Sequence, residues 1–217
     1  MWYRLAGVVV RLFFRLVFRW RVSGVEHVPA SGPVLLCANH ISLLDPPLIA
    51  APLKRRVSFM AKEQLFRIPV LNRVIRAFGA FPVRRGAVDR RSLRTALDVL
   101  ERGGLLVIFP EGTRSRTGEL LPGKPGAGLL ALKSRATVIP AYIQGPYRPF
   151  RPVYVYYGPP VDLRPFWTEE PTVDEARRAT DAIMAAIRRL AEAHGQDAGR
   201  EGGVPQAPVK RAAKDAR

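Results

Sequence analysis

The chain has 217 residues and a mass of 24.1 kDa, which suits one domain with short appendages and leaves little room for a second core. Hydrophobic residues make up 47% and aromatic residues 9%, enough to fill a core, so globally disordered and collagen-like classes are excluded. The single cysteine, Cys37, cannot form an internal disulfide and points to a reducing compartment. Three histidines are too few for a His-rich metal site, so we expect a metal-free globular protein.

Basic residues outnumber acidic residues by 35 to 18, which gives a formal net charge of +17. Such an excess predicts an anionic partner: nucleic acid, an acidic membrane surface, a phosphorylated substrate or an acidic carrier protein. Most of the basic residues are arginine, whose planar guanidinium suits phosphate geometry. A GC-rich genome would give the same arginine bias, so composition alone does not identify the partner.

Residues 1–24 are predicted to form an amphipathic helix. They contain no acidic residue, and four of their arginines fall within about 80° of one another on a helical projection: Arg4, Arg11, Arg15 and Arg19. Apolar and aromatic residues surround them, but no uncharged run approaches the ~20 residues that span a bilayer. A basic stripe opposite a wide apolar face is typical of a helix that lies in the membrane interface. An ordinary helix docked on its own domain is the alternative.

Beyond residue 24 short apolar runs alternate with helical patterns. In chain order these patterns predict a strand at Pro33–Ala38, a helix at Pro46–Ala51, a strand at Val57–Met60, a helix at Ile68–Phe78, a strand at Ala80–Val83, a helix at Asp89–Arg102, a strand at Leu105–Phe109, a helix at Gly126–Arg135, strands at Val138–Ile143 and Val153–Tyr157, and a helix at Thr172–His194. This alternation predicts an α/β fold with a mixed, mostly parallel sheet flanked by helices.

The sequence therefore predicts three segments. An amphipathic membrane-interface helix occupies 1–24, and a single globular domain occupies 25–194. Beyond it glycine, alanine, proline and charged residues follow without periodicity, so we expect 195–217 to be a disordered basic tail.

The first reactive segment follows the first buried strand. His40 follows the end of that strand, and in α/β sheets the functional groups lie at the carboxyl ends of strands. Asp45 comes five residues later. A turn between them could fold the carboxylate back onto the imidazole, fix its tautomer and make it a general base for a hydroxyl. In the alternative, His40 bonds to loop carbonyls while Asp45 caps a helix whose first residue is Pro46. The spacing alone leaves both arrangements open.

The second reactive segment follows the strand at Leu105–Phe109 and reads Pro110-Glu111-Gly112-Thr113-Arg114-Ser115-Arg116. A glycine at this place lets the backbone approach a ligand closely, and the hydroxyl and guanidinium groups suit a phosphate. Glu111 would either balance the arginines or accept a substrate hydroxyl. A charged surface loop is the alternative.

Together these segments resemble the glycerolipid acyltransferases, and most of all the 1-acyl-sn-glycerol-3-phosphate acyltransferases. The first and third blocks of that family are matched by Asn39-His40-Ile41-Ser42-Leu43-Leu44-Asp45-Pro46 and by Phe109-Pro110-Glu111-Gly112-Thr113-Arg114-Ser115. The second and fourth blocks are matched by Gly79–Arg85 and by Val138-Ile139-Pro140. The resemblance extends from about Val25 to Gly158.

The resemblance implies a role for each matched residue. His40 is the catalytic base, and Asp45 orients it. The residues that it implies for substrate binding, mostly around the phosphate of the acceptor, are Ser42, Arg85, Glu111, Gly112, Thr113, Arg114 and Lys124. Lys124 could instead face the oxyanion of the thioester, and Ser42 could bond within its own turn.

The resemblance also implies the reaction. A fatty acyl group would pass from acyl-CoA or acyl carrier protein (acyl-ACP) to the free hydroxyl of lysophosphatidic acid, giving phosphatidic acid, by direct attack and without metal or cofactor. The expected partners are the acyl donor, the lysolipid and an anionic membrane surface, with the protein peripheral or monotopic on the cytoplasmic face of the cell membrane. The alternatives are another lysophospholipid or hydroxylated lipid acceptor, or an inactive membrane-binding protein. No nucleic acid is expected, because no recognition motif accompanies the charge.

Overall fold

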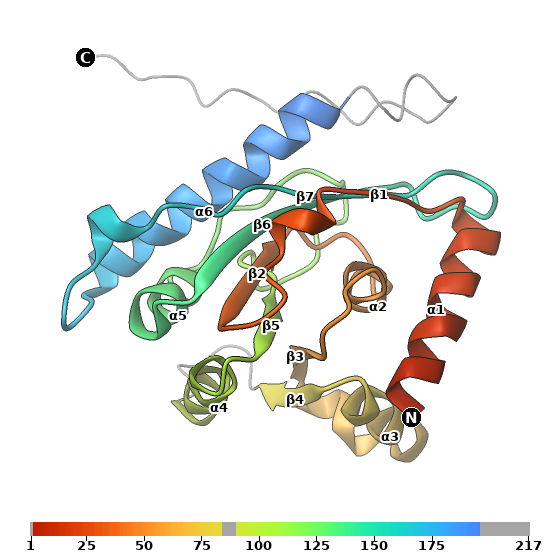
Figure 1. Cartoon of the computed structure of the whole chain (residues 1–217), viewed down its shortest axis with the longest axis horizontal. Helices are drawn as coiled ribbons and strands as arrows, with labels where there is room; N and C mark the ends of the chain where they lie inside the picture. The colour runs from red at the N-terminus through yellow and green to blue at the C-terminus, as the bar shows by residue number, and fades with distance from the viewer. Residues whose placement is uncertain (1, 84–89, 196–217) are drawn as a thin grey trace.

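The computed structural model of the chain describes residues 2–83 and 90–195. Within them seven strands form one sheet in the order β1-β7-β6-β2-β5-β3-β4 (Figure 1). Every neighbouring pair is parallel except β6 and β7, which are antiparallel. The strands are β1 (Arg21–Ser23), β2 (Val34–Ala38), β3 (Val57–Lys62), β4 (Ala80–Val83), β5 (Leu105–Ile108), β6 (Thr137–Gln144) and β7 (Tyr154–Tyr157). The expected α/β fold with a mixed, mostly parallel sheet is confirmed.

Helices cover both faces of this sheet (Figure 1). The helices are α1 (Trp2–Phe18), α2 (Asp45–Ala50), α3 (Pro69–Ala77), α4 (Arg90–Glu101), α5 (Gly126–Ser134) and α6 (Val173–His194), with short 3₁₀ helices η1 (Val25–His27), η2 (Glu63–Arg67) and η3 (Arg164–Phe166). α4, α5 and α6 share the core on one face, and α1 and α2 share the core on the other. α3 packs beside β4 at the edge of the sheet.

The central strand β2 is buried on both faces, which explains its uninterrupted apolar sequence. Leu35 and Cys37 point into the core under α4, α5 and α6. Val34, Leu36 and Ala38 point into the core under α1 and α2. Because neither face of β2 is exposed to solvent, a reactive side chain in this part of the chain can reach a substrate only from beyond the end of the strand.

The first helix docks on its own domain and also exposes apolar side chains to solvent. Phe14 and Phe18 are buried in the core shared with α2, and the Arg11 guanidinium donates to the carbonyl of Ala51 at 3.3 Å. α1 therefore docks on its own domain. A second apolar face of the helix is exposed, and it consists of Val8, Val9, Leu12, Phe13 and Leu16. The apolar residues thus form two faces, one toward the core and one toward solvent, instead of the single face predicted opposite the arginines.

The helix is shorter than the predicted segment 1–24. α1 ends at Phe18, and Arg21–Ser23 forms the edge strand β1, which pairs with β7. Gly24 follows at φ 76°, where a Cβ would collide with the carbonyl oxygen of Tyr157. His27 Nδ1 bonds to the same carbonyl at 2.9 Å. Residues 21–24 therefore belong to the sheet, and the predicted boundary moves to the end of α1.

Other elements follow the predictions with shifted ends. β3 continues to Lys62 because its pairing with β4 continues until Lys62 lies opposite Val83. α2 begins at Asp45 itself and not at Pro46. Asp89, predicted to begin a helix, and residues 196–217 of the predicted tail lie outside the described residues.

Replacing Phe14 by alanine is expected to lower the free energy of unfolding by about 3–5 kcal/mol, because it empties a core position that is only 1% exposed. Leu12→Ala is the matched control on the same helix, at a position that is 55% exposed, and should change this free energy by less than about 0.5 kcal/mol. Urea unfolding followed by circular dichroism measures both values. Equal effects of the two substitutions would contradict the docking of α1.

Candidate active site

Three adjacent strands at the centre of the sheet end at the same edge. β5, β2 and β6 are parallel neighbours, so the segments that follow them emerge side by side. The backbone N–H of Ser115, after β5, donates to the carbonyl of His40, after β2, at 2.7 Å. The two reactive segments of the sequence are therefore brought together.

Asn39 fixes the point at which the chain leaves β2. Its side-chain amide donates to the carbonyl of Ile143 at 2.9 Å, and its Oδ1 accepts from the N–H of Ile143 at 2.7 Å. This pair of bonds takes over the sheet pairing at the end of β2 and ties that end to β6. The next residue, His40, thus starts from a rigid position.

The imidazole of His40 and the carboxylate of Asp45 are in contact. His40 Nδ1 lies 2.7 Å from Asp45 Oδ2, which also accepts from the N–H groups of Ile41 at 2.6 Å and Ser42 at 2.7 Å. The hydroxyl of Tyr147 donates to Asp45 Oδ1 at 2.6 Å. The carboxylate is fully buried, and these four donors satisfy it. Because a carboxylate only accepts hydrogen bonds, the hydrogen of the ring lies on Nδ1 and Nε2 is left as the acceptor.

The alternative in which Asp45 caps its helix is excluded by this geometry. Leu44 precedes the first residue of α2, and no side chain caps the first turn. The N–H groups of Ile41 and Ser42 converge on the carboxylate and draw it back over the turn. The folded-back arrangement is therefore present, and the predicted N-cap is wrong.

The His40 ring is held on one face and open at one nitrogen. It stacks on Phe109, with ring centroids 4.1 Å apart, and 9% of its side chain is exposed. Among the described residues Nε2 has no hydrogen-bond partner, and it is not one of the fully buried polar atoms that lack one. Nε2 therefore meets solvent, where a substrate hydroxyl can reach it.

The loop after β5 presents polar side chains near this ring. Gly112 has φ 67°, and the chain of Lys124 passes 2.9 Å from the place where a Cβ would lie. The N–H of Lys124 donates to the carbonyl of Pro110 at 2.8 Å, which holds the two parts of the loop together. Thr113, Arg114 and Lys124 are exposed. Gly112 thus leaves room for the Lys124 side chain, and the loop gathers a hydroxyl and two cations.

Glu111 differs from the prediction that it balances the arginines. It is 2% exposed and makes no ion pair with Arg114 or Arg116 within the part of the chain that the structure describes. Burial raises the pKa of its carboxyl to about 7, and the negative charge of Asp45 adds to this. The N–H groups of Leu121 and His40 lower the pKa in part, although neither reaches good hydrogen-bond geometry. Glu111 therefore lies under the loop as a carboxyl group that titrates near neutral pH.

The remaining predicted residues fall in different places. Ser42 bonds within its turn, since its hydroxyl accepts from the N–H of Leu44 at 3.2 Å. Arg85 lies outside the described residues. Cys37 is fully buried in β2, and burial raises the pKa of its thiol far above the usual value, so it is not a nucleophile.

Sequence reasoning misses one residue of the site, Tyr147. It lies after β6, in a segment rich in proline and arginine that matches no block of the family. Its only signal is its position: it follows a strand that is parallel to β2, so it reaches the same edge of the sheet. That position is visible only once the order of the strands is known.

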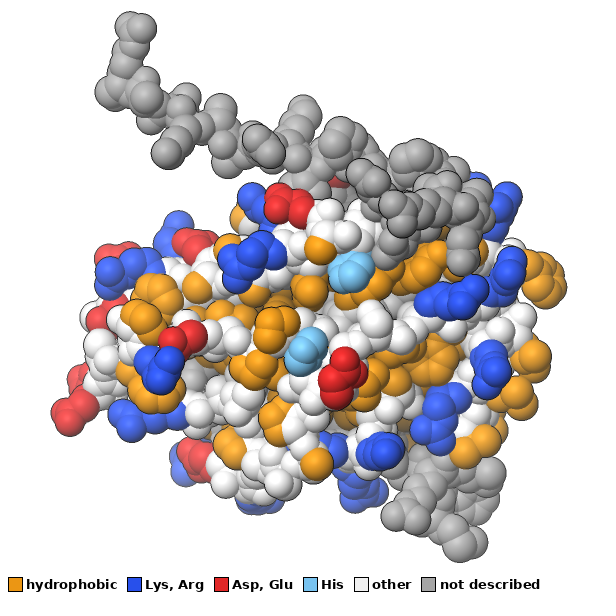
Figure 2. Space-filling model, turned by 45° about the horizontal axis from the view of Figure 1, so that its top comes forward, with side chains coloured by type: hydrophobic (Ala, Val, Ile, Leu, Met, Phe, Trp, Pro, Cys, Tyr) orange, Lys and Arg blue, Asp and Glu red, His pale blue; other side chains and the backbone are white. Residues whose placement is uncertain are grey.

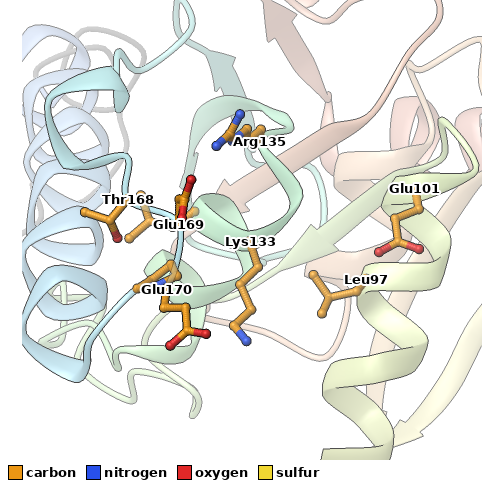
Figure 3. Close-up of a pocket in the computed structure, with 9 residues that line it drawn as sticks. Leu97, Glu101, Lys133, Arg135, Thr168, Glu169 and Glu170 are labelled. Carbon is orange, nitrogen blue, oxygen red and sulfur yellow. The ribbon is translucent and has the colours of Figure 1, made fainter.

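The structure also contains a depression of about 700 Å³ at another place (Figure 3). Leu97 and Glu101 of α4, Lys133 and Arg135 at the end of α5, and Thr168 to Glu170 before α6 line it. The end of α5 leads into the start of β6, so the depression lies toward the amino ends of the parallel strands. It includes none of the residues around His40.

Comparison with known proteins gives one consistent result. The Acyltransferase family model matches residues 19–144. A chloroplastic 1-acyl-sn-glycerol-3-phosphate acyltransferase of Brassica napus is 32% identical over 133 residues, 59% of this chain and 38% of that protein. A 1-acyl-sn-glycerol-3-phosphate acyltransferase of Borreliella burgdorferi is 33% identical over 126 residues, 55% of this chain and 48% of that protein. The crystal structure of the 1-acyl-sn-glycerophosphate acyltransferase PlsC from Thermotoga maritima is similar with a TM-score of 0.70 and 30% identity, and the match covers 88% of this chain and 79% of that one.

The chain belongs to the Acyltransferase family, since the family model covers more than half of it. The resemblance drawn from the sequence blocks is confirmed. The chain spans less than half the length of the two curated relatives. The matched range includes His40, Asp45 and Glu111 but ends before Tyr147.

Glu111→Gln is expected to change how stability depends on pH. Because the folded protein holds the Glu111 proton up to about pH 7 and an unfolded chain releases it near pH 4.5, the stability of the native protein falls as the pH rises through this window. Glutamine cannot titrate, so the melting temperature of the variant relative to the native protein should rise between about pH 5 and pH 7.5. Differential scanning calorimetry measures the difference. A difference that stays constant with pH would contradict the buried titrating carboxyl.

Proposed function

We propose that the protein transfers a fatty acyl group from an acyl thioester, either acyl-CoA or acyl-ACP, to the free hydroxyl of 1-acyl-glycerol-3-phosphate and so forms phosphatidic acid. The observation that carries the proposal is the 2.7 Å contact between His40 Nδ1 and Asp45 in a member of the Acyltransferase family. The similarity to 1-acyl-sn-glycerol-3-phosphate acyltransferases of other organisms supports this choice of acceptor.

In the proposed reaction His40 Nε2 removes the proton from the lysolipid hydroxyl, and the oxygen attacks the carbonyl carbon of the thioester. A C–O bond forms, the tetrahedral oxyanion collapses, the C–S bond breaks, and the thiolate takes up the proton from the imidazolium. Asp45 keeps the ring in the required tautomer and stabilises the imidazolium. A base held in this way contributes about 10²–10⁴ in rate. The scheme needs no metal or further cofactor.

The loop after β5 supplies the groups for the charged parts of the substrates. Arg114 and Thr113 are exposed donors suited to the acceptor phosphate, and Arg85 is proposed to join them. Lys124 lies against Gly112, where its ammonium can reach the phosphate or the oxyanion. Ser42 shapes the turn that carries the base. Glu111, buried beneath, is proposed to position the loop that binds the substrate.

The reaction is tested with the purified protein, a panel of lysolipids, and acyl-CoA against acyl-ACP. We expect phosphatidic acid from lysophosphatidic acid, and His40→Ala should lower the rate by about 10²–10⁴. The variant should keep its melting temperature and its binding to liposomes, because Asp45 retains the donors on Ile41, Ser42 and Tyr147.

Other outcomes of this assay decide between the alternatives. Faster acylation of another lysophospholipid or hydroxylated lipid would replace the proposed acceptor. No transfer to any acceptor, together with normal liposome binding, would leave a membrane-binding protein without catalysis. Equal loss of transfer, folding and liposome binding in His40→Ala would mean that the histidine is structural.

We also propose that the exposed face of α1 binds an anionic membrane surface from the cytoplasmic side. No helix within the described residues is long and apolar enough to cross a bilayer. Exposed hydrophobic side chains lie among Lys and Arg side chains on the right-hand side of Figure 2, the side on which α1 lies in Figure 1. Leu43, in the turn that carries His40, is also exposed. A lipid substrate would thus meet the base without leaving the interface.

Replacing the exposed residues Val8, Leu12 and Leu16 with glutamine should lower the affinity for anionic vesicles at least tenfold, because it removes apolar surface without touching Phe14 or Phe18 in the core. Val173→Gln, at an exposed apolar position on α6, is the control and should bind as the native protein does. Vesicle sedimentation measures the binding. Unchanged sedimentation of the triple variant would contradict the membrane role of α1.

A further inference from the structure

We propose that Tyr147 is a positioning residue of the active site, whose hydroxyl orients Asp45 and sets how strongly His40 holds its proton. This inference rests on the proposed roles of His40 and Asp45 as base and orienting carboxylate. Tyr147 lies outside the range matched by the family model, so the inference comes from the structure of this chain.

The contact of Tyr147 with the carboxylate is short and specific. Its hydroxyl donates to Asp45 Oδ1 at 2.6 Å, whereas His40, Ile41 and Ser42 all bond to Oδ2. Among the described residues Tyr147 is therefore the hydrogen-bond partner of the second oxygen, and it fixes the rotation of the carboxylate about its Cβ–Cγ bond. Without it, Oδ2 alone would hold the carboxylate, which could then turn away from the ring.

The hydroxyl stays a donor under all assay conditions. Burial raises the pKa of Tyr147 far above its usual value, and the charge of Asp45 and the hydrogen bond to it raise the pKa further. Tyr147 therefore never supplies a charge of its own. Its effect on the site comes entirely from the hydrogen bond.

The first helix holds Tyr147 in place. The Tyr147 ring packs edge-on against the ring of Phe18 at the end of α1, with centroids 5.7 Å apart. The N–H of Phe150 donates to the carbonyl of Val17 at 2.6 Å, and the N–H of Val153 donates to the carbonyl of Phe18 at 3.1 Å. Two backbone hydrogen bonds and one ring contact thus hold the loop after β6 against the end of α1, next to that helix in Figure 1. A loop fixed in this way can hold a hydroxyl at one position.

The hydrogen bond from Tyr147 draws negative charge toward Oδ1 and so weakens the pull of the carboxylate on the proton of an imidazolium. The base then releases its proton to the leaving thiolate more readily, and it is free to act at lower pH. Among the described residues, Glu111 lies close enough for the charge of Asp45 to raise its pKa, and Lys124 lies against the neighbouring Gly112 on the same loop. Because burial raises the pKa of Glu111 to about 7, a pH–rate profile alone would not separate its effect from that of His40.

The test is Tyr147→Phe, which removes the hydroxyl and keeps the ring on Phe18. The proton NMR titration of His40 follows its charge directly, because the chain has only three histidines and the His40 signal is the one lost in His40→Ala. We expect this titration to move to higher pH in the variant. In the acyl-transfer assay kcat at neutral pH should fall roughly tenfold, the effect of losing one hydrogen bond to a charged group, while KM for both substrates stays within about twofold.

Tyr157→Phe is the matched control. The Tyr157 hydroxyl donates at 2.6 Å to the carbonyl of Ile49, so its removal costs the same helix, α2, a hydrogen bond of the same length without touching Asp45. This control should leave kcat and the His40 titration as in the native protein. The melting temperature of both variants shows whether each is folded.

Each outcome has a definite meaning. A shifted His40 titration and a lower kcat in Tyr147→Phe but not in Tyr157→Phe support the proposal. An unshifted titration, or equal loss of kcat in both variants, overturns it. If the native protein transfers no acyl group but the titration still shifts, the positioning role stands and the proposed reaction fails.

Discussion

The buried carboxylate of Asp45 is the group on which the geometry of the site depends. An anion enclosed by protein is tolerated only where donors surround it, and here His40, Ile41, Ser42 and Tyr147 supply them. Three of these donors are neighbours in one turn, and the fourth comes from the end of a different strand. They converge only when that turn folds back and β6 lies parallel beside β2. The orientation of the imidazole is thus a consequence of satisfying a buried charge.

The sequence predicts the fold well because the central strands have no solvent face. An apolar run such as β2 cannot be read as anything but a buried element, and the turn signals around it set its ends. The edge strand β1 is different. Arg21–Ser23 continues the basic composition of the preceding helix, and only its pairing with β7, more than a hundred residues away, makes it a strand. Local pattern has no access to such a pairing.

The candidate site likewise has features that the sequence predicts and features that it does not. The five-residue spacing of His40 and Asp45 permits two arrangements. The backbone N–H groups of Ile41 and Ser42 select between them, and such groups leave no signal in a sequence. Glu111 stands among arginines in the sequence and yet lies buried, because the loop turns at Gly112 and carries the charged residues outward. The sequence predicts which reactive side chains are present, but it does not predict the direction in which the backbone orients them.

The first helix supports the candidate site and also forms part of the surface. Its buried face packs Phe18 against Tyr147, whose hydroxyl bonds to Asp45, while its other face exposes apolar residues beside arginines. Deleting the helix would therefore expose the core and free the Asp45 carboxylate while it also removed the exposed apolar face. Such a deletion would not separate a loss of membrane binding from a loss of activity. Substitutions confined to the exposed face separate the two. If that face rests on a bilayer, the His40 imidazole lies at a fixed distance from the lipid surface. Packed rings and hydrogen bonds connect it to the helix through Asp45 and Tyr147.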